Sequence, residues 1–214
     1  MMTKDIQKIV KTLVLIVEIF VGLISLAFAQ DQREESGKKD QMQTLFGFDS
    51  KITGYGSLDT KFTRLQGKDA IIIGGHGGVI FNSYFYFGLG AYGLVTTNQF
   101  PANFPEEDLN MHMGYTGMMM GFNMMPKKVV HFSIPLFVGV GNLELEYNDA
   151  FVENSVFLLF EPGLHLELNV VQFMKIGIGG GYRFVNGTNL RNPLVDEDLS
   201  YWTGDFSIIF GKFK

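Results

Sequence analysis

The residues best suited to chemistry lie at alternate positions of one segment, Phe157–Leu168. Glu161, His165 and Glu167 share one face there, and apolar residues occupy the positions between them. Carboxylates and an imidazole held together could bind a cation, or could pair with basic side chains that follow the same alternation elsewhere. We expect the second arrangement, a polar network that fills the interior of the protein. Its predicted members are Asp59, Lys61, Glu161, His165, Glu167, Lys175, Arg183 and Asp205.

A second candidate is His131 with Ser133, two positions apart on one strand face, and Glu144 further along the chain. A histidine and an acid can activate a serine as a nucleophile. The arrangement resembles that of outer-membrane lipid A deacylases. However, His131 follows a basic turn that we place on the periplasmic side, whereas lipid A lies in the external leaflet. The alternation also turns both side chains inward. We therefore do not expect an enzyme, and we predict no catalytic residue.

Two glycine motifs are weaker candidates for phosphate binding. Gly88–Gly93 matches G-x-G-x-x-G, but a proline-containing link follows it where the nucleotide-binding motif needs a helix. Gly74–Gly78 lacks the Lys-Ser/Thr of a P-loop. We interpret both as bent β-strands and predict no cofactor.

Methionines are concentrated in one stretch that begins Met111-His112-Met113. Thioethers with a histidine can bind Cu(I), although methionine more often fills apolar space. The sequence leaves open whether this stretch binds a metal, and we predict no metal ligand. The other members are Met118, Met119, Met120, Met124 and Met125.

From Lys51 onward, apolar and polar residues alternate with a period of two, which indicates β-strands with one apolar face. The predicted strands are long enough to cross a membrane at a tilt, which needs about 9–11 residues. The links after the second, fourth and sixth strands are short. The strands are Lys51–Leu65, Ala70–Phe81, Tyr84–Thr96, Met111–Phe122, Val129–Leu143, Phe157–Leu168, Met174–Phe184 and Ser200–Phe213.

Three longer polar links follow the third, fifth and seventh strands: Thr97–Asn110, Glu146–Asn154 and Asn186–Leu199. Short turns on one side and long loops on the other are typical of outer-membrane barrels. We expect these links to form the external binding surface. Its predicted acidic residues are Glu106, Glu107, Asp108, Asp196, Glu197 and Asp198.

The first residues have the features of an export signal. Lys4, Lys8 and Lys11 precede the apolar run Thr12–Ala27, and Ala27-Phe28-Ala29 offers a small-x-small cleavage pattern. We expect residues 1–29 to be a cleaved signal peptide, 30–47 a flexible periplasmic lead-in, and 48–214 the barrel.

Composition agrees with a curved sheet and excludes several classes of function. The chain of 214 residues contains 26 Gly and 21 Phe, which suit bends and pleated apolar surfaces. A net charge of -5 gives no basic footprint for nucleic acid. The absence of cysteine excludes disulfides and thiolate metal sites.

The alternation from Lys51 to Lys214 resembles that of small eight-stranded outer-membrane barrels of the OmpA/OmpX type. The stretch Lys61–Leu94 also resembles outer-membrane barrel proteins of Bacteroidetes-like bacteria. The resemblance implies an outer-membrane location and contact with outer-membrane lipid and lipopolysaccharide. It also implies recognition of an aromatic residue near the last strand's end, here Phe213, by the barrel-assembly machinery.

Together these features predict an all-β protein, an eight-stranded antiparallel up-and-down transmembrane β-barrel preceded by a cleaved signal peptide. Its predicted role is structural or interactive, with an envelope protein as partner at the external loops. The alternative is a narrow pore or a conduit for small or hydrophobic molecules. A lipid A-modifying enzyme is the third and least favoured hypothesis.

Overall fold

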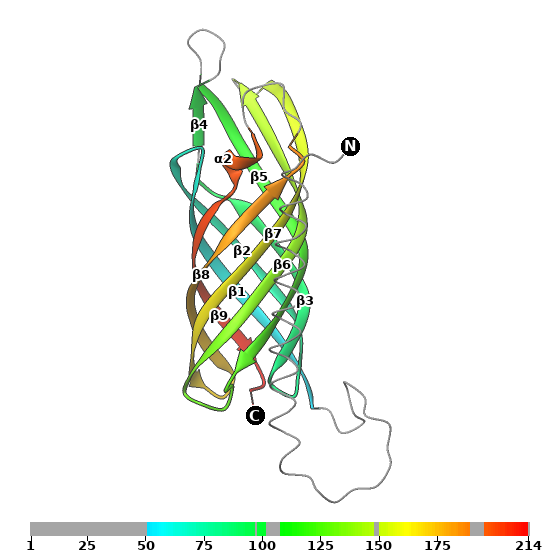
Figure 1. Ribbon diagram of the computed structural model, residues 1–214, viewed down its shortest axis with the longest axis vertical. Coiled ribbons are helices and arrows are strands. Elements are labelled where there is room, and N and C mark those ends of the chain that lie inside the picture. Colours follow the sequence, from blue (N-terminus) through cyan, green and yellow to red (C-terminus); the bar gives the residue numbers. More distant parts are fainter. Residues whose placement is uncertain (1–50, 97, 102–107, 148–149, 189–194, 214) are drawn as a thin grey trace, which may run out of the picture. The chain divides into compact units, whose positions relative to one another are not determined.

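The computed structural model describes residues 51–96, 98–101, 108–147, 150–188 and 195–213, all within one compact unit, Phe48–Lys214. The predicted signal peptide and lead-in lie outside these residues. The described part contains nine strands and one short helix, α2 (Asp196–Leu199) (Figure 1). The strands are β1 (Ile52–Leu65), β2 (Lys68–Phe81), β3 (Phe85–Leu94), β4 (Asn98–Pro101), β5 (Asp108–Met124), β6 (Val130–Tyr147), β7 (Ala150–Val171), β8 (Met174–Asn186) and β9 (Tyr201–Gly211).

The strands form one closed antiparallel barrel. Their order is β3-β2-β1-β9-β8-β7-β6-β5-β4, and a further pairing of β3 with β5 closes the ring. The short β4 is not a separate wall strand, because it pairs with Asp108–Met111 of β5 beyond the point where β3 leaves β5 at Gly114. The described residues therefore form an eight-stranded up-and-down barrel, which confirms the predicted fold class. No helix among them is long and apolar enough to span a membrane.

The two ends of the barrel differ (Figure 1). β4 and α2 lie at one end, which we call the loop end, and β1 begins and β9 finishes at the other, which we call the turn end.

Gln66 and Gly67 join β1 to β2 with φ angles of 49° and 75°, and Asn82 and Ser83 precede β3 with 50° and 68°. Two consecutive positive φ angles are those of a type I′ turn, whose twist matches an antiparallel pair.

The three long links predicted from the sequence are shorter in the structure, because each contains regular structure. Thr97–Asn110 includes β4 and the first residues of β5, and Asn186–Leu199 finishes in α2. Most of Glu146–Asn154 belongs to β6 and β7, which pair as far as Tyr147 and Ala150. In this segment the sequence no longer alternates between apolar and polar residues. β6 and β7 nevertheless remain paired, because their backbone N–H and C=O groups still need hydrogen-bond partners.

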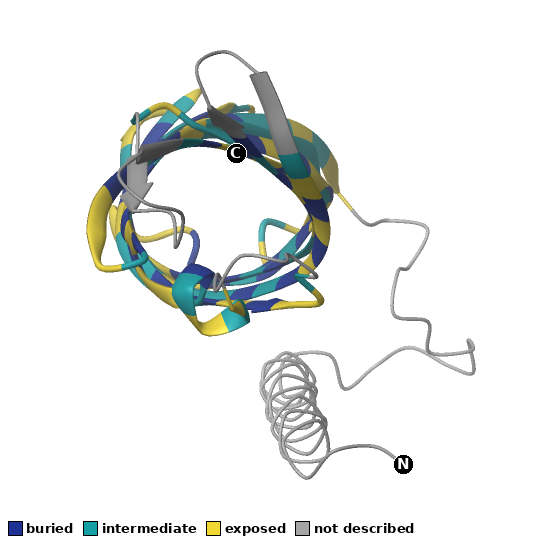
Figure 2. Ribbon diagram, turned by 90° about the horizontal axis from the view of Figure 1, so that it is seen from above, coloured by how far each residue is buried: buried dark blue, intermediate teal, exposed yellow. Residues whose placement is uncertain are grey.

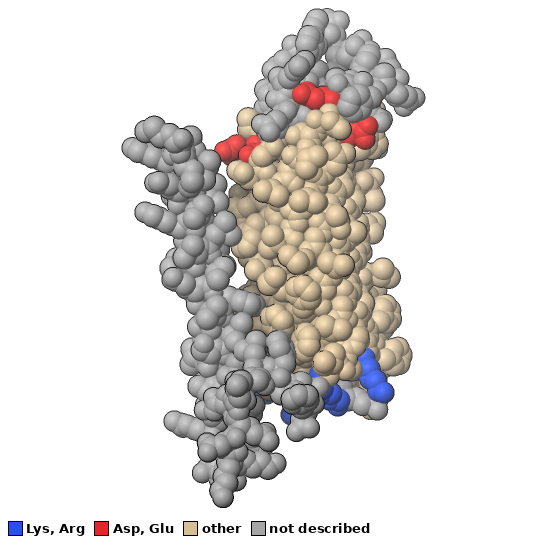
Figure 3. Space-filling view, turned by 90° about the vertical axis from the view of Figure 1, so that its right-hand side faces the viewer, with Lys and Arg blue, Asp and Glu red and all other residues tan. Residues whose placement is uncertain are grey.

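Buried and exposed residues alternate along the strands (Figure 2), so that one face of the sheet lines the lumen and the other lies outside. The outer face is apolar: Leu58 is 65% exposed and Leu89 is 67% exposed. On the face shown in Figure 3, the described acidic residues gather at the loop end, the basic residues at the turn end, and neither kind lies between. An apolar band bounded by charged ends is the surface that a membrane-spanning barrel presents to lipid.

Aromatic rings form two bands on this exterior, one toward each end. Such girdles mark the interfaces of membrane barrels. The loop-end pairs are Tyr182–Trp202 and Phe160–Phe184, with ring centroids 5.2 and 6.1 Å apart, and the turn-end pairs are Phe81–Phe85 and Tyr84–Phe122, at 6.3 and 6.0 Å.

Glycines allow neighbouring strands to approach closely in β2 and β3. Gly78 lies opposite Gly88, and a Cβ atom on either would collide with the backbone of the facing strand. Gly74–Gly78 is therefore part of the barrel wall. Gly88–Gly93 lies inside β3 and does not precede a helix, so it lacks the structure that a nucleotide-binding motif requires.

Candidate functional site

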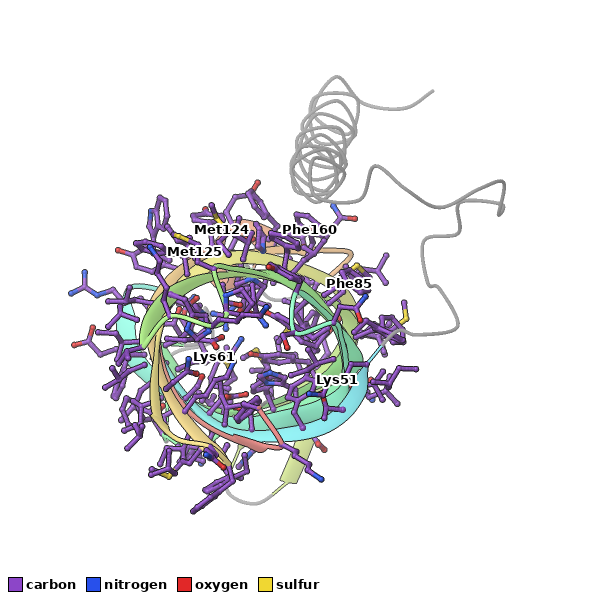
Figure 4. All side chains as sticks on the ribbon, turned by 90° about the horizontal axis from the view of Figure 1, so that it is seen from below. Lys51, Lys61, Phe85, Met124, Met125 and Phe160 are labelled. Atoms are coloured by element: carbon purple, nitrogen blue, oxygen red, sulfur yellow. The ribbon has the colours of Figure 1, made fainter. Side chains whose placement is uncertain are left out.

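All eight side chains of the predicted polar network face the lumen. Figure 4 shows Lys61 inside the barrel, whereas Phe85, Met124 and Phe160 point outward. Lys61 is only 4% exposed. The other seven, all buried or nearly so, are Asp59, Glu161, His165, Glu167, Lys175, Arg183 and Asp205.

Ion pairs cross the middle of the lumen. Lys61 of β1 pairs with Glu161 of β7, two strands that are not neighbours in the sheet. The Lys61 ammonium also lies 4.4 Å from the centre of the Tyr92 ring. His165 Nε2 lies 3.1 Å from Asp205 Oδ2. These contacts join strands that are not neighbours in the sheet, through the interior of the barrel.

Asp59 pairs with groups that were not among the predicted network. Its Oδ2 lies 2.7 Å from His76 Nδ1 and accepts a hydrogen bond of 2.9 Å from the Tyr92 hydroxyl. His76 lies between glycines, in a run that was predicted only as a bent strand. Its alternation with Gly74 and Gly78 was the signal that places it on the lumen face.

Little space remains among these side chains. The cavity they line has a volume of about 20 Å³. A cavity of about 10–15 Å³ or more can hold one water molecule, so this one has room for very few. Eight-stranded barrels are just wide enough for side chains to fill them, and here they do.

A second polar cluster lies toward the turn end. Glu167 Oε2 lies 3.1 Å from His131 Nε2 and 3.3 Å from Lys175 Nζ. Phe213 follows β9 and folds back, so that its ring centre lies 4.3 Å from Lys175 Nζ. The Phe213 N–H holds this position by donating to the carbonyl of Gln172 at 3.1 Å. The aromatic ring thus covers the lumen lysine from the turn end.

Toward the loop end the lumen becomes apolar, a feature that was not predicted from the sequence. Leu199 of α2 is completely buried in this layer, so the helix packs into the mouth of the barrel. The main members are Leu65, Ile72, Met111, Met113, Leu143, Leu145, Phe157, Leu159, Val185 and Leu199.

Arg183 lies next to this apolar layer. Its Nε donates to the carbonyl of Leu199 at 3.0 Å, and its Nη2 donates to Thr63 Oγ1 at 3.3 Å. The guanidinium therefore links β8 to β1 and holds the last residue of α2.

The His131 and Ser133 pair does not form a nucleophilic triad. The Ser133 hydroxyl shares a 3.1 Å hydrogen bond with Tyr86, and His131 pairs with Glu167. Glu144, the predicted third member, lies opposite Asn154 in the extension of β6 toward the loop end. Both His131 and Ser133 are buried, without the access that a substrate would need.

The methionine-rich stretch divides between the two faces of β5. Met111, Met113 and Met119 are buried in the lumen, whereas His112 and Met118 are exposed on the exterior. His112 therefore points away from its flanking thioethers. In the described ranges, no three His, Asp or Glu side chains come together as metal ligands.

Of the six predicted acidic surface residues, three have described side chains. Asp196 accepts hydrogen bonds from the N–H groups of Gly187 and Thr188, and Asp198 accepts one from Val195. These two carboxylates therefore shape the α2 turn. Glu197 is exposed, Asp108 begins β5, and Glu106 and Glu107 lie outside the described residues.

Part of the sheet projects at the loop end. The pairing of β7 with β8 stops at Leu158 and Asn186, whereas β7 continues to Ala150 alongside β6. On the exterior, exposed Val156 and Leu158 give way to exposed Asn154 in this direction. The first eight residues of β7 therefore form a sheet edge that no other described strand covers.

Small outer-membrane barrels have similar structures. The N-terminal β-barrel domain of Pseudomonas aeruginosa OprF matches 73% of this chain and 96% of its own, with 9% identity and a TM-score of 0.51. Neisserial surface protein A matches 77% and 99%, with 10% identity and a TM-score of 0.49. Ail, the attachment invasion locus protein of Yersinia pestis, matches 75% and 96%, with 12% identity and a TM-score of 0.40.

No protein-family model and no curated protein matches the chain. At these identities the structural likeness concerns the fold, and it confirms the predicted small eight-stranded outer-membrane β-barrel. The predicted likeness to proteins of Bacteroidetes-like bacteria receives no support from the comparisons.

Proposed function

We propose that this protein is an interaction barrel, which anchors in the outer membrane and presents its projecting sheet to a partner protein. The observation that carries the proposal is the edge of β7 from Ala150 to Phe157, which lacks a neighbouring strand among those described. An uncovered edge offers backbone N–H and C=O groups to an extended segment of another chain. The polar exterior at Asn154 keeps this edge outside the lipid band.

The filled lumen supports an interaction role over the alternative of a pore or conduit. Phe213 covers Lys175 at the turn end, and Leu199 is packed into the loop end. Between them, the mid-lumen cavity is about 20 Å³. A conducting path would require several of these side chains to move together, so we expect no channel events in planar bilayers.

The targeting segments belong to the same proposal. Residues 1–29 direct export and are removed, and residues 30–47 remain as a periplasmic lead-in. This places the turn end in the periplasm and the loop end outside. Outer-membrane lipid surrounds the apolar band, lipopolysaccharide meets the loop end, and the barrel-assembly machinery inserts the chain.

An enzymatic role is not part of the proposal. The Ser133 hydroxyl bonds to Tyr86 and is buried, which gives a lipid no approach to it. We expect lipid A mass spectra to be unchanged after deletion of the gene.

Photo-crosslinking in intact cells tests the interaction directly. A photoreactive residue at Asn154 should give adducts larger than the barrel, because this position lies on the projecting sheet. The matched control is Leu89, which is exposed in the middle of the lipid band and should give none. Equal adducts from both positions, or none from Asn154, would contradict the proposal, and channel events in bilayers would favour the conduit.

A further inference from the structure

Arg183 differs from the other charged side chains of the lumen, because it is a buried cation with no acidic partner among the described residues. It is 0% exposed. Lys61 and Lys175 each pair with a glutamate, whereas no described carboxylate forms an ion pair with Arg183. Burying a charge is costly unless an opposite charge compensates it. The positive charge of Arg183 is therefore not compensated by any described residue.

The guanidinium of Arg183 also lacks described acceptors for some of its N–H donors. A guanidinium has five N–H donors. Two of them are used, toward Leu199 and Thr63. Nη1 is buried and has no hydrogen-bond partner within the described ranges.

Thr203 adds a second buried donor beside it. Its hydroxyl also has no hydrogen-bond partner in the part of the chain that the structure describes. The register pairs Gly181 with Thr203 and Arg183 with Tyr201, so Arg183 and Thr203 are diagonal neighbours on the lumen face of β8 and β9. Two unsatisfied donors, one of them positively charged, require an acceptor that carries negative charge.

We propose that Arg183 and Thr203 form a binding site for an oxyanion, the carboxylate or phosphate group of a small ligand. The planar guanidinium can meet two oxygens of such a group at once. The apolar residues Leu65, Val185 and Leu199 lie nearby and exclude water, which strengthens an ionic hydrogen bond. A water molecule could satisfy the donors but would leave the charge uncompensated.

α2 covers this site from the loop end. The Leu199 carbonyl is bound by Arg183, and the Asp198 carbonyl accepts a hydrogen bond of 2.8 Å from the Gln66 N–H. Gly187, with a φ of 98°, lies at the beginning of the segment that leads to α2. For an anion to reach Arg183 from the mouth, α2 would have to move away from its hydrogen-bonded position. The site lies in the lumen and is therefore separate from the proposed binding edge of β7.

The full chain folded in detergent micelles allows a direct test, because Trp202 is its single tryptophan and precedes Thr203. Inorganic phosphate or acetate, titrated against chloride at constant ionic strength, should change Trp202 fluorescence saturably and raise the unfolding temperature. A stronger response to phosphate than to acetate would assign the site to phosphate groups, and the reverse to carboxylates. Chloride alone should give neither response.

Four variants connect the response to the site. Arg183→Gln should abolish it, and Thr203→Val should weaken it. Arg64→Gln is the matched control, because Arg64 is exposed and pairs with Asp69 at the surface, and it should respond like the wild type.

If Arg183→Gln does not fold, Arg183→Lys keeps the charge but loses the planar fork. It should bind phosphate about tenfold more weakly, as expected for a lost charged hydrogen bond. No saturable response in the wild type, or an unchanged response in Arg183→Lys, would overturn the proposal.

Discussion

At the scale of single residues, the lumen shows how a narrow barrel buries charges of both signs. Lys61 and Glu161 come from strands that are not neighbours, and their contact spans the interior. Such a pair adds little stability compared with apolar residues of the same size, but removing one partner leaves an uncompensated charge. The pair therefore constrains which strands can face each other across the lumen.

Replacing Lys61 tests this role. Lys61→Met should lower the free energy of unfolding by about 3–5 kcal/mol, the cost of leaving a buried Glu161 unpaired. The measurement is urea unfolding of the barrel refolded into lipid vesicles. The control, Arg64→Met, breaks an exposed pair with Asp69 and should cost about 1 kcal/mol or less. Equal losses in the two variants would show that the lumen pair is not effectively buried.

Alternation in the sequence assigned the eight polar side chains to one face, and the structure places them in the lumen. Their partners could not be predicted, because contacts across a barrel depend on the stagger of all eight strands. Lys61 and Glu161 are 100 residues apart, and only the closed register brings them together. The same limit concealed that no described carboxylate pairs with Arg183. The contact of Asp59 with His76 joins the adjacent strands β1 and β2, and it was missed because His76 lies among glycines.

At the scale of elements, the segment after β9 closes the turn end. Phe213 can fold back over Lys175 because Gly211 lacks a side chain. A Cβ atom at Gly211 would come within 2.8 Å of the Phe213 ring. A small residue in the backbone thus determines whether the lumen lysine is covered.

Two substitutions should uncover Lys175. Phe213→Ala removes the ring, and Gly211→Ala displaces it, so both should increase the rate at which an amine-specific reagent modifies Lys175. Mass spectrometry of the labelled, folded barrel gives the rate at each lysine. Lys128, which is exposed at the turn end, should react equally in all forms. A Lys175 rate that stays at the wild-type value in both variants would contradict the covering role.

The strands themselves were predictable where they meet lipid, because only there must one face be continuously apolar. Beyond that band β6 and β7 continue as a ladder with polar exterior residues such as Asn154, and Glu146–Asn154 was therefore predicted as a loop. α2 was missed for a related reason: its four residues are too few to show a helical period, and Asp196 and Asp198 were interpreted as a solvated acidic surface.

At the scale of the whole molecule, the exterior defines where the membrane lies. Leu89→Arg places a charge in the middle of the apolar band and should destabilise the barrel by about 2–4 kcal/mol. Asn154→Arg lies on the projecting sheet and should cost about 0–1 kcal/mol. Unfolding in vesicles measures both, and a cost at Asn154 equal to that at Leu89 would place the projecting sheet inside the lipid.

The central claim is that this barrel has lipid on its apolar face and charges in its filled interior. Nitroxide labels on single cysteines along β1 test it directly, because the chain has no cysteine of its own. In vesicles, labels at Leu58, Thr60 and Phe62 should show high accessibility to oxygen, whereas labels at Ser57 and Thr63 should be shielded from oxygen and from a water-soluble relaxing agent. A period of two with this phase is the predicted result. High accessibility to the water-soluble agent at Leu58 and Phe62 would contradict the account.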